Sequence, residues 1–200
     1  MNLPTNIIFT GVGGQGNVLA AKLVAAALLD AGQEVAVGDV FGLSQRGGSV
    51  ASHVRYWHGG PVPPLISRGH VDVVVGFEPL EALRILCEFG NPGTLVLVND
   101  IPIPPVGVLM GRTEYPPQAQ MLAQMRELAR EVIAIDGVDL AHQAGDAQGL
   151  NLVMVGALLG LGLLPLTLDA MKAHVKASVP VRFLDMNLRA LDLGSGHTQD

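Results

Sequence analysis

The stretch Ile7-Ile8-Phe9-Thr10-Gly11-Val12-Gly13-Gly14-Gln15-Gly16 is an apolar run that breaks into glycines and is followed by a long pattern rich in Ala and Leu. This order is typical of a buried strand, a tight turn and the start of a helix. Gly11, Gly13 and Gly16 have the G-x-G-x-x-G spacing. In that motif the first glycine allows the turn, the second lets a ligand approach the backbone, and the third permits close helix–strand packing. The stretch therefore predicts a doubly wound α/β domain.

The helix start after this turn is a favourable place for an anion. Its first backbone N–H groups have no intrahelical partner, and the helix dipole adds partial positive charge, so a phosphate fits there. Asp39 ends the expected second strand, over 35–40, where nicotinamide-dinucleotide proteins carry the acid that binds the ribose. Two interpretations stay open: a dinucleotide site, or glycines that only pack the first helix on the first strand.

Length and composition favour one domain with helices on both faces of a sheet. The chain has 200 residues, 49% of them hydrophobic and only 4% aromatic, and Ala, Val and Leu dominate the apolar content. That composition suits a mostly parallel sheet buried on both faces. We expect a Rossmann-like three-layer α/β sandwich over residues 1–193, followed by a flexible tail over 194–200.

Charge and cysteine content exclude several classes of function for this chain. A net charge of −6 without a dense run of Lys or Arg argues against a nucleic-acid-binding surface. The single cysteine, Cys87, excludes a disulfide framework and a cysteine-ligated iron–sulfur cluster held by this chain alone, and we expect it to be a small buried hydrophobe. The scattered histidines predict no metal site. The first residues lack a signal-peptide pattern, so we expect a cytoplasmic protein.

Periodicity and turn residues predict the remaining elements. Helices are expected at 18–31, 79–88, 118–130, 168–178 and 181–191. Core strands are expected at 71–77, 94–98 and 132–135. Residues 49–57 alternate between apolar and polar, which predicts a half-buried strand in a hairpin or at the sheet edge.

Residues 152–164 form an uncharged apolar run of 13 residues with Gly156 and Gly160 at G-x-x-x-G spacing. The run is too short for a typical membrane span, so we expect a helix buried in the core or under a partner subunit. The glycine pair allows another backbone to come close. We take this helix as a candidate contact with a partner.

A second glycine-rich loop, residues 41–49, follows the second strand directly and can reach the first glycine turn. Its spacing departs by one residue from the G-x-S-x-G elbow, so we do not expect a hydrolase nucleophile, and we assign no catalytic residue. Ten residues from the two loops are the candidate binding residues: Gly11, Gly13, Gly14, Gln15, Gly16, Ser44, Gln45, Arg46, Gly47 and Gly48.

The two loops at this spacing resemble the gamma-type subunits of 2-oxoacid:ferredoxin oxidoreductases (the pyruvate/ketoisovalerate oxidoreductase gamma family), most closely the two-subunit arylpyruvate (indolepyruvate) type. The likeness covers most of residues 6–192. Further matching positions are Val54-Arg55, Asp72-Val73-Val74, Glu78-Pro79-Leu80-Glu81-Ala82, Asn151, Asn187 and Ala190.

This resemblance implies one non-redox subunit of an enzyme that converts a 2-oxoacid and coenzyme A into an acyl-coenzyme A, CO2 and reduced ferredoxin. The resemblance further implies that thiamine diphosphate, magnesium and iron–sulfur clusters lie on a larger catalytic alpha subunit. This chain agrees, because it has one cysteine and lacks the Gly-Asp-Gly motif of thiamine enzymes. Ferredoxin is expected to meet the complex. No membrane or nucleic-acid partner is expected, and a homodimer of the isolated chain is left open.

The family's gamma-type domain is associated with coenzyme A, so the resemblance also implies that the two loops hold a coenzyme A phosphate or a pantetheine amide. Arg46 would then supply a forked donor to a phosphate oxygen. Alternatively, Gln45 and Arg46 order their own loop or bind the alpha subunit. Two rival functions remain: a free-standing NAD(P)-dependent oxidoreductase, which lacks a visible proton-donor set here, and a purely structural assembly subunit.

Overall fold

The computed structural model describes residues 4–42, 48–104, 108, 110–111 and 114–198. Within them, one mixed sheet has the strand order β2-β3-β1-β4-β5-β6. Its strands are β1 (Thr5–Val12), β2 (Glu34–Phe41), β3 (Ser49–Trp57), β4 (Val73–Gly76), β5 (Leu95–Asn99) and β6 (Glu131–Ile135). Strands β1, β4, β5 and β6 pair in parallel, whereas β3 is antiparallel to both of its neighbours.

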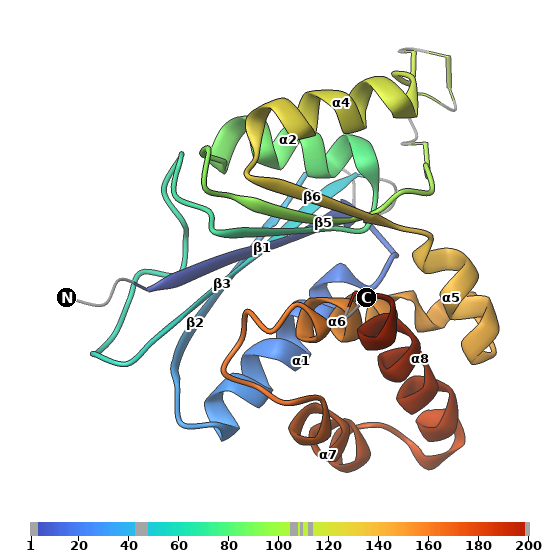
Figure 1. The fold of residues 1–200 in the computed structure, drawn as a ribbon. Helices are drawn as coiled ribbons and strands as arrows, with labels where there is room; N and C mark the ends of the chain where they lie inside the picture. Colours follow the sequence, from blue (N-terminus) through green and yellow to red (C-terminus); the bar gives the residue numbers. More distant parts are fainter. Residues whose placement is uncertain (1–3, 43–47, 105–107, 109, 112–113, 199–200) are drawn as a thin grey trace.

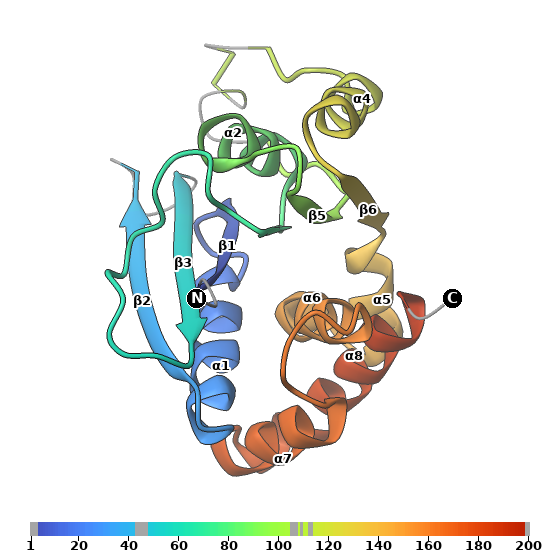
Figure 2. The same cartoon turned by 60° about the vertical axis from the view of Figure 1, so that its left-hand side comes forward.

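Helices cover both faces of the sheet, which confirms the predicted three-layer α/β class (Figure 1). One face carries α2 (Pro79–Phe89) and α4 (Gln118–Leu128). The other side carries α1 (Asn17–Asp30), α5 (Gly137–Ala144), α6 (Leu150–Gly160), α7 (Leu168–Ser178) and α8 (Leu184–His197), with the short 3-10 turns η1 (Ala147–Gly149) and η2 (Val181–Phe183). Figure 2 shows α7 beside the end of α1, below α6 and α8.

Each core strand buries residues on both faces. Along β1, Ile7 and Phe9 pack into the cluster formed with α1 and α6, while Ile8 packs into the cluster formed with α2 and α4. This follows from the two-residue period of a strand, which sends neighbouring side chains to opposite faces. The nearly continuous apolar runs of the parallel strands are therefore explained by burial on both sides.

The predicted hairpin is formed by β2 and β3, and β3 has the predicted bounds. It is not the edge strand, because it lies between β1 and β2 and pairs with both. The expectation of a half-buried strand is accordingly wrong: most of β3 is buried. Strand β2 forms one edge of the described sheet and is considerably more exposed than β3.

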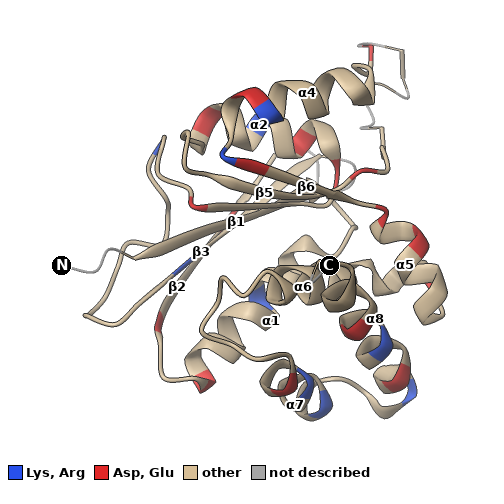
Figure 3. Ribbon diagram, viewed as in Figure 1, with Lys and Arg blue, Asp and Glu red and all other residues tan. Residues whose placement is uncertain are grey.

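The uncharged helix is α6, which Figure 3 shows without a charged residue. Residues 150–159 are all buried, and the helix packs against α8 and α1. A Cβ added at Gly156 would overlap the backbone of Leu191, so the glycine lets the two helices approach closely. This confirms the expectation of a helix buried in the core, and α8 of the same chain packs on the face that carries Gly156. No helix in the described part of the chain is long and apolar enough to cross a membrane.

The C-terminal segment also differs from expectation. The chain forms η2 and then α8, which continues to His197 instead of ending near 191, so residues 194–197 are helical where a tail was predicted. Gly194 and Ser195 are buried, and the hydroxyl of Thr198 donates to the Ala157 carbonyl at 2.9 Å. Glycine commonly ends a helix, but Gly194 lies within α8 and permits close packing on α6.

Helix α5 was not predicted from the sequence. The segment has only eight residues, begins with Gly137 and lacks a long apolar period. Its local signal is the N-cap, where the Asp136 carboxylate accepts from the Asp139 N–H at 2.8 Å.

Candidate functional site

The first glycine turn joins β1 to α1 at the carboxyl end of the sheet. Gly14 and Gly16 have positive φ values of 108° and 85°, a region that favours glycine. Gly16 is the N-cap of α1, has no side chain to cap the helix, and is followed by a first turn without an acidic residue. The helix start thus offers unpaired backbone donors and positive dipole potential to a ligand.

The Gln15 side chain fixes this turn to the neighbouring strand end. Its Oε1 accepts from the Val12 N–H at 2.6 Å, and its Nε2 donates to the Phe77 carbonyl at 2.9 Å. A Cβ at Gly11 would lie 2.6 Å from Gln15 Oε1 and 2.9 Å from Phe77 Cβ. Gly11 therefore makes room for the Gln15 side chain, which holds the turn across the gap between β1 and β4.

The same hydrogen-bonded edge continues to β5 and β6 through Asn99, a residue that the sequence analysis did not select. Its Nδ2 donates to the Phe77 carbonyl at 3.1 Å, and its Oδ1 accepts from the Gly137 N–H at 3.0 Å. The feature of the sequence that could have indicated Asn99 is its position directly after the apolar residues of β5. Four strand ends are thus tied together beneath the glycine turn.

The second candidate loop is only partly described. Ser44, Gln45, Arg46 and Gly47 lie outside the described residues. Gly48, at the end of this loop, accepts from the Gly13 N–H through its carbonyl at 2.9 Å. The fold therefore brings the end of the second loop directly against the first glycine turn.

A hollow of about 420 Å³ opens over the first turn. Gly13, Gly14 and Gly16 supply its backbone wall, and exposed Lys22 lies one helical turn further along α1. Leu19, Phe41 and neighbouring apolar side chains form the remaining wall. Lys22 was not among the predicted site residues, although it is a rare charge on an otherwise apolar helix and falls on the face of Val18 and Leu19. Backbone donors, a helix start and an ammonium group suit an anion attached to an apolar body.

Asp39 does not take the position of a dinucleotide-binding acid. The inserted β3 separates β2 from β1, so Asp39 lies two strands away from the glycine turn. Its carboxylate accepts from the Ser52 hydroxyl at 2.6 Å. The geometry therefore gives no support to the dinucleotide interpretation.

A buried acid lies at the next strand end. Glu78 follows β4 and caps α2, where its Oε2 accepts from the Glu81 N–H at 2.9 Å. The Tyr115 hydroxyl donates to its other oxygen. Burial raises the pKa of the Glu78 carboxyl, and burial together with Glu78 raises the pKa of Tyr115.

Replacing Glu78 by glutamine is expected to reduce the loss of stability with rising pH. Because the folded pKa lies above the unfolded value of 4.5, the stabilising contribution is complete below that value and is lost as pH rises through the folded pKa. Denaturant unfolding between about pH 5 and 8 measures this slope. Glu127→Gln, an exposed change on α4, should retain the wild-type slope, and an equally steep slope in Glu78→Gln would contradict the assignment.

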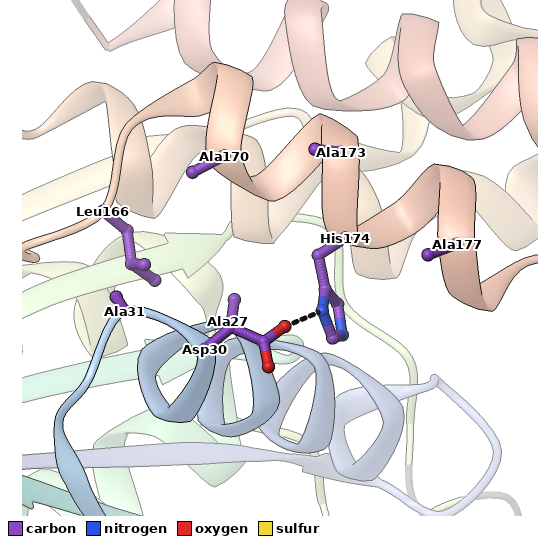
Figure 4. Close-up of a pocket in the computed structure, with 8 residues that line it drawn as sticks. All are labelled: Ala27, Asp30, Ala31, Leu166, Ala170, Ala173, His174 and Ala177. Atoms are coloured by element: carbon purple, nitrogen blue, oxygen red, sulfur yellow. Dashed lines mark hydrogen bonds and ion pairs between the residues drawn. The ribbon is translucent and has the colours of Figure 1, made fainter.

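Other polar positions lie away from this site. His174 Nδ1 and Asp30 Oδ2 pair at 2.8 Å beside an alanine-lined hollow of about 410 Å³ between α1 and α7 (Figure 4). Cys87 is exposed on α2, so the expectation of a buried thiol is wrong: the helix turns Ala82, Ile85 and Leu86 inward instead. Among the described residues, no three His, Cys, Asp or Glu side chains form a group that could hold a metal.

The chain belongs to the pyruvate ferredoxin/flavodoxin oxidoreductase family, whose model matches residues 6–196. It is 42% identical over 193 residues to a protein of Thermococcus kodakarensis named indolepyruvate oxidoreductase subunit IorB, covering 94% of this chain and 93% of that protein. The subunit of the same name from Archaeoglobus fulgidus is 35% identical over 189 residues, covering 94% and 92%. The predicted family resemblance is confirmed.

Solved structures share the fold. The gamma subunit of a keto/oxoacid ferredoxin oxidoreductase from Geobacter sulfurreducens superposes with a TM-score of 0.68 at 22% identity, covering 97% of this chain and 98% of that one. The 2-oxoglutarate:ferredoxin oxidoreductase of Magnetococcus marinus, whose structure has 2-oxoglutarate, coenzyme A and succinyl-CoA bound, gives a TM-score of 0.74 at 22% identity. That match covers 100% of this chain but 32% of the larger one.

Proposed function

We propose that this chain is the smaller, non-redox subunit of a 2-oxoacid:ferredoxin oxidoreductase of the arylpyruvate type, with indolepyruvate as substrate. The proposal rests on near full-length matches, at 42% identity, to proteins named indolepyruvate oxidoreductase subunit IorB. The complex would convert the 2-oxoacid and coenzyme A into an acyl-coenzyme A and CO2 and would pass the electrons to ferredoxin. It would act in the cytoplasm.

The redox groups would belong to a larger partner subunit. One cysteine is too few for a cluster ligated by this chain alone, so the iron–sulfur clusters, like thiamine diphosphate and its magnesium, would lie on the alpha subunit. That subunit would also supply the contact to ferredoxin. The contribution of this chain would then be binding and positioning.

The hollow over the glycine turn is the proposed place of contact with coenzyme A. The backbone N–H groups of Gly14 and Gly16 and the Lys22 ammonium would hold a phosphate, and Leu19 and Phe41 would contact an apolar part of the ligand. Gln15 would act indirectly, because its amide already holds the turn. Ser44, Gln45, Arg46, Gly47 and Gly48 of the second loop would also contact the ligand, with Arg46 as a forked phosphate donor.

Lys22→Ala in the assembled enzyme is expected to raise the apparent KM for coenzyme A by about tenfold, with little change in kcat. The reason is that the lost phosphate contact contributes to binding of coenzyme A and not to the chemical step. Steady-state ferredoxin reduction at varied coenzyme A measures the effect. Lys176→Ala, an exposed lysine on α7, is the matched control and should leave the KM unchanged. An unchanged KM in intact Lys22→Ala enzyme would remove the phosphate role.

The subunit assignment has its own test. Co-expression with the large subunit should give a complex that survives gel filtration, and the purified complex should contain thiamine diphosphate and iron. A purely structural assembly subunit predicts instead that loop substitutions weaken the complex without changing coenzyme kinetics separately. A chain that stays free of any large subunit would contradict the proposal.

A further inference from the structure

Strand β2 leaves one side of its backbone open. Within the described residues it pairs with β3 alone, and Figure 2 shows no helix or strand beyond it. The Gly42 N–H donates to the Ser49 carbonyl at 2.8 Å, one residue past the end of the strand. Residues of an antiparallel strand alternate between those that bond the neighbouring strand and those that point away from it. Even-numbered residues of β2 therefore bond β3. The open side carries the N–H and C=O groups of the odd-numbered residues, Val35, Val37, Asp39 and Phe41.

This edge lacks the features that commonly prevent an open strand from pairing with another chain. Such features are a short strand, Lys, Pro or a bulge. Strand β2 has eight residues, contains neither Lys nor Pro, and pairs with β3 in unbroken register. The carboxylate within it, that of Asp39, accepts from the Ser52 hydroxyl of β3 and so leans away from the open side. Strand β6 at the opposite edge has only five residues.

Apolar side chains are exposed on both faces of this edge. Val37 and Phe41 point to the α1 face and are 37% and 62% exposed, and Val40 on the other face is 47% exposed. Leu65 is 52% exposed and lies over Gly38, because a Cβ at Gly38 would be 2.9 Å from Leu65 Cδ2. An open backbone between two exposed apolar rows favours the addition of another strand.

The sequence of β2 is complementary to itself in one antiparallel register. A twofold axis through Gly38 sets odd-numbered residues opposite odd-numbered ones, as hydrogen bonding between the two open sides requires. No two carboxylates then face each other, and the exposed apolar side chains gain apolar neighbours. The facing residues of the two copies in this register are Val35 and Phe41, Val37 and Asp39, and Ala36 and Val40.

Neighbouring positions of the axis are less favourable. An axis through Asp39 would bring the two Asp39 carboxylates face to face, and like charges directly opposite are destabilising. An axis through Val37 would set Phe41 opposite Gln33, which lies outside the strand, and would leave the most exposed apolar side chain of β2 without an apolar partner. The axis through Gly38 also brings the exposed Leu65 side chains of both copies to the same face.

We propose that β2 is the interface of a homodimer, in which two copies of this chain join their six-stranded sheets in antiparallel register about a twofold axis at Gly38. The second copy is the occupant because the strand pairs with itself over residues 35–41 without a charge conflict. This interface goes beyond the proposed function and does not depend on it, since it rests on β2 alone.

Amide hydrogen exchange of the full chain at several protein concentrations tests the interface without any substitution. The N–H groups of the odd-numbered residues 35, 37, 39 and 41 should exchange at least tenfold faster when the protein is diluted to monomers. Those of residues 36, 38 and 40 should stay protected, because they bond β3 within one copy. A wild-type chain that stays monomeric at all concentrations would overturn the proposal. Protection of the odd-numbered residues only on assembly with the large subunit would also overturn it, and would assign the edge to a strand of that subunit.

A charge substitution at Val37 tests the register. Val37→Asp sets a second carboxylate opposite Asp39 at two places in the dimer, so the dimer Kd measured by analytical ultracentrifugation should rise at least tenfold. Val37→Lys sets an ammonium group opposite the same carboxylate and should keep the wild-type Kd or lower it. Leu128→Asp, at an exposed position on α4, is the control and should leave the Kd unchanged. Equal weakening by Asp and Lys at Val37, or an unchanged Kd in folded Val37→Asp, would overturn the proposed pairing.

Discussion

Replacing Gly194 by alanine is expected to destabilise the protein by about 3 kcal/mol, a large effect for a single methyl group. The added Cβ would overlap the Val153 carbonyl oxygen and lie 2.9 Å from the Ala157 backbone nitrogen. Both atoms belong to the backbone of buried α6, which cannot rotate away as a flexible side chain does. Urea unfolding of the full chain, followed by circular dichroism, measures the loss.

Gly196 provides a matched control on the same helix. A Cβ at this position would meet nothing within 4 Å, and the residue has no positive φ. Gly196→Ala should therefore be neutral or should stabilise by at most about 1 kcal/mol through helix propensity. Equal destabilisation by the two substitutions would contradict the close crossing of α6 and α8.

Gly11→Ala is expected to cost about 2 kcal/mol of stability and to weaken coenzyme binding by the assembled enzyme. The new methyl group would occupy the space of Gln15 Oε1, while Phe77 Cβ blocks the other side. The Gln15 side chain would have to leave, so the Val12 N–H would lose its acceptor and the turn would lose its link to β4. Urea unfolding and the coenzyme A titration measure the two effects.

A double-mutant cycle separates this explanation from general overpacking. Gln15→Ala alone removes the same two hydrogen bonds without adding a methyl group at Gly11. If Gly11→Ala acts mainly by expelling Gln15, the double variant should lose clearly less than the sum of the single variants. Strictly additive losses would show that the two residues act independently.

The central elements of this fold could be predicted from local pattern. The apolar run that ends in glycines fixed the strand, turn and helix of β1 and α1, and uninterrupted Val and Leu runs indicated strands covered on both faces. These patterns are local consequences of burial and glycine geometry. Long-range pairing is not local, so the insertion of β3 between β1 and β2 had no signal in the strand itself.

The errors have a common physical cause. Gly156 was assigned to a possible contact with a partner, and residues 194–200 were expected to be a tail. In the structure Gly156 and Gly194 each make room for the other helix of one buried pair. A glycine inside a helix can indicate a close approach of another backbone or an unusual φ value. The sequence does not show which backbone approaches. The exposure of Cys87 could likewise not be predicted from the sequence, because packing against other elements determines which face of a helix is buried.

The candidate site could be predicted from the sequence only in part. The glycine turn is a local motif, and the link from Gly13 to Gly48 agrees with two loops that meet. Lys22 and Asn99 join the glycine turn only after the sheet and helices have packed. Their contribution depends on distances between segments far apart in the chain, which spacing in sequence does not contain.

Ferredoxin reduction by the purified large subunit, with and without this chain, tests the central claim most directly. With indolepyruvate and coenzyme A present, we expect reduction only when both subunits are mixed, and we expect this chain alone to reduce nothing. Full activity of the large subunit by itself, or turnover of a 2-oxoacid by this chain alone, would contradict the account.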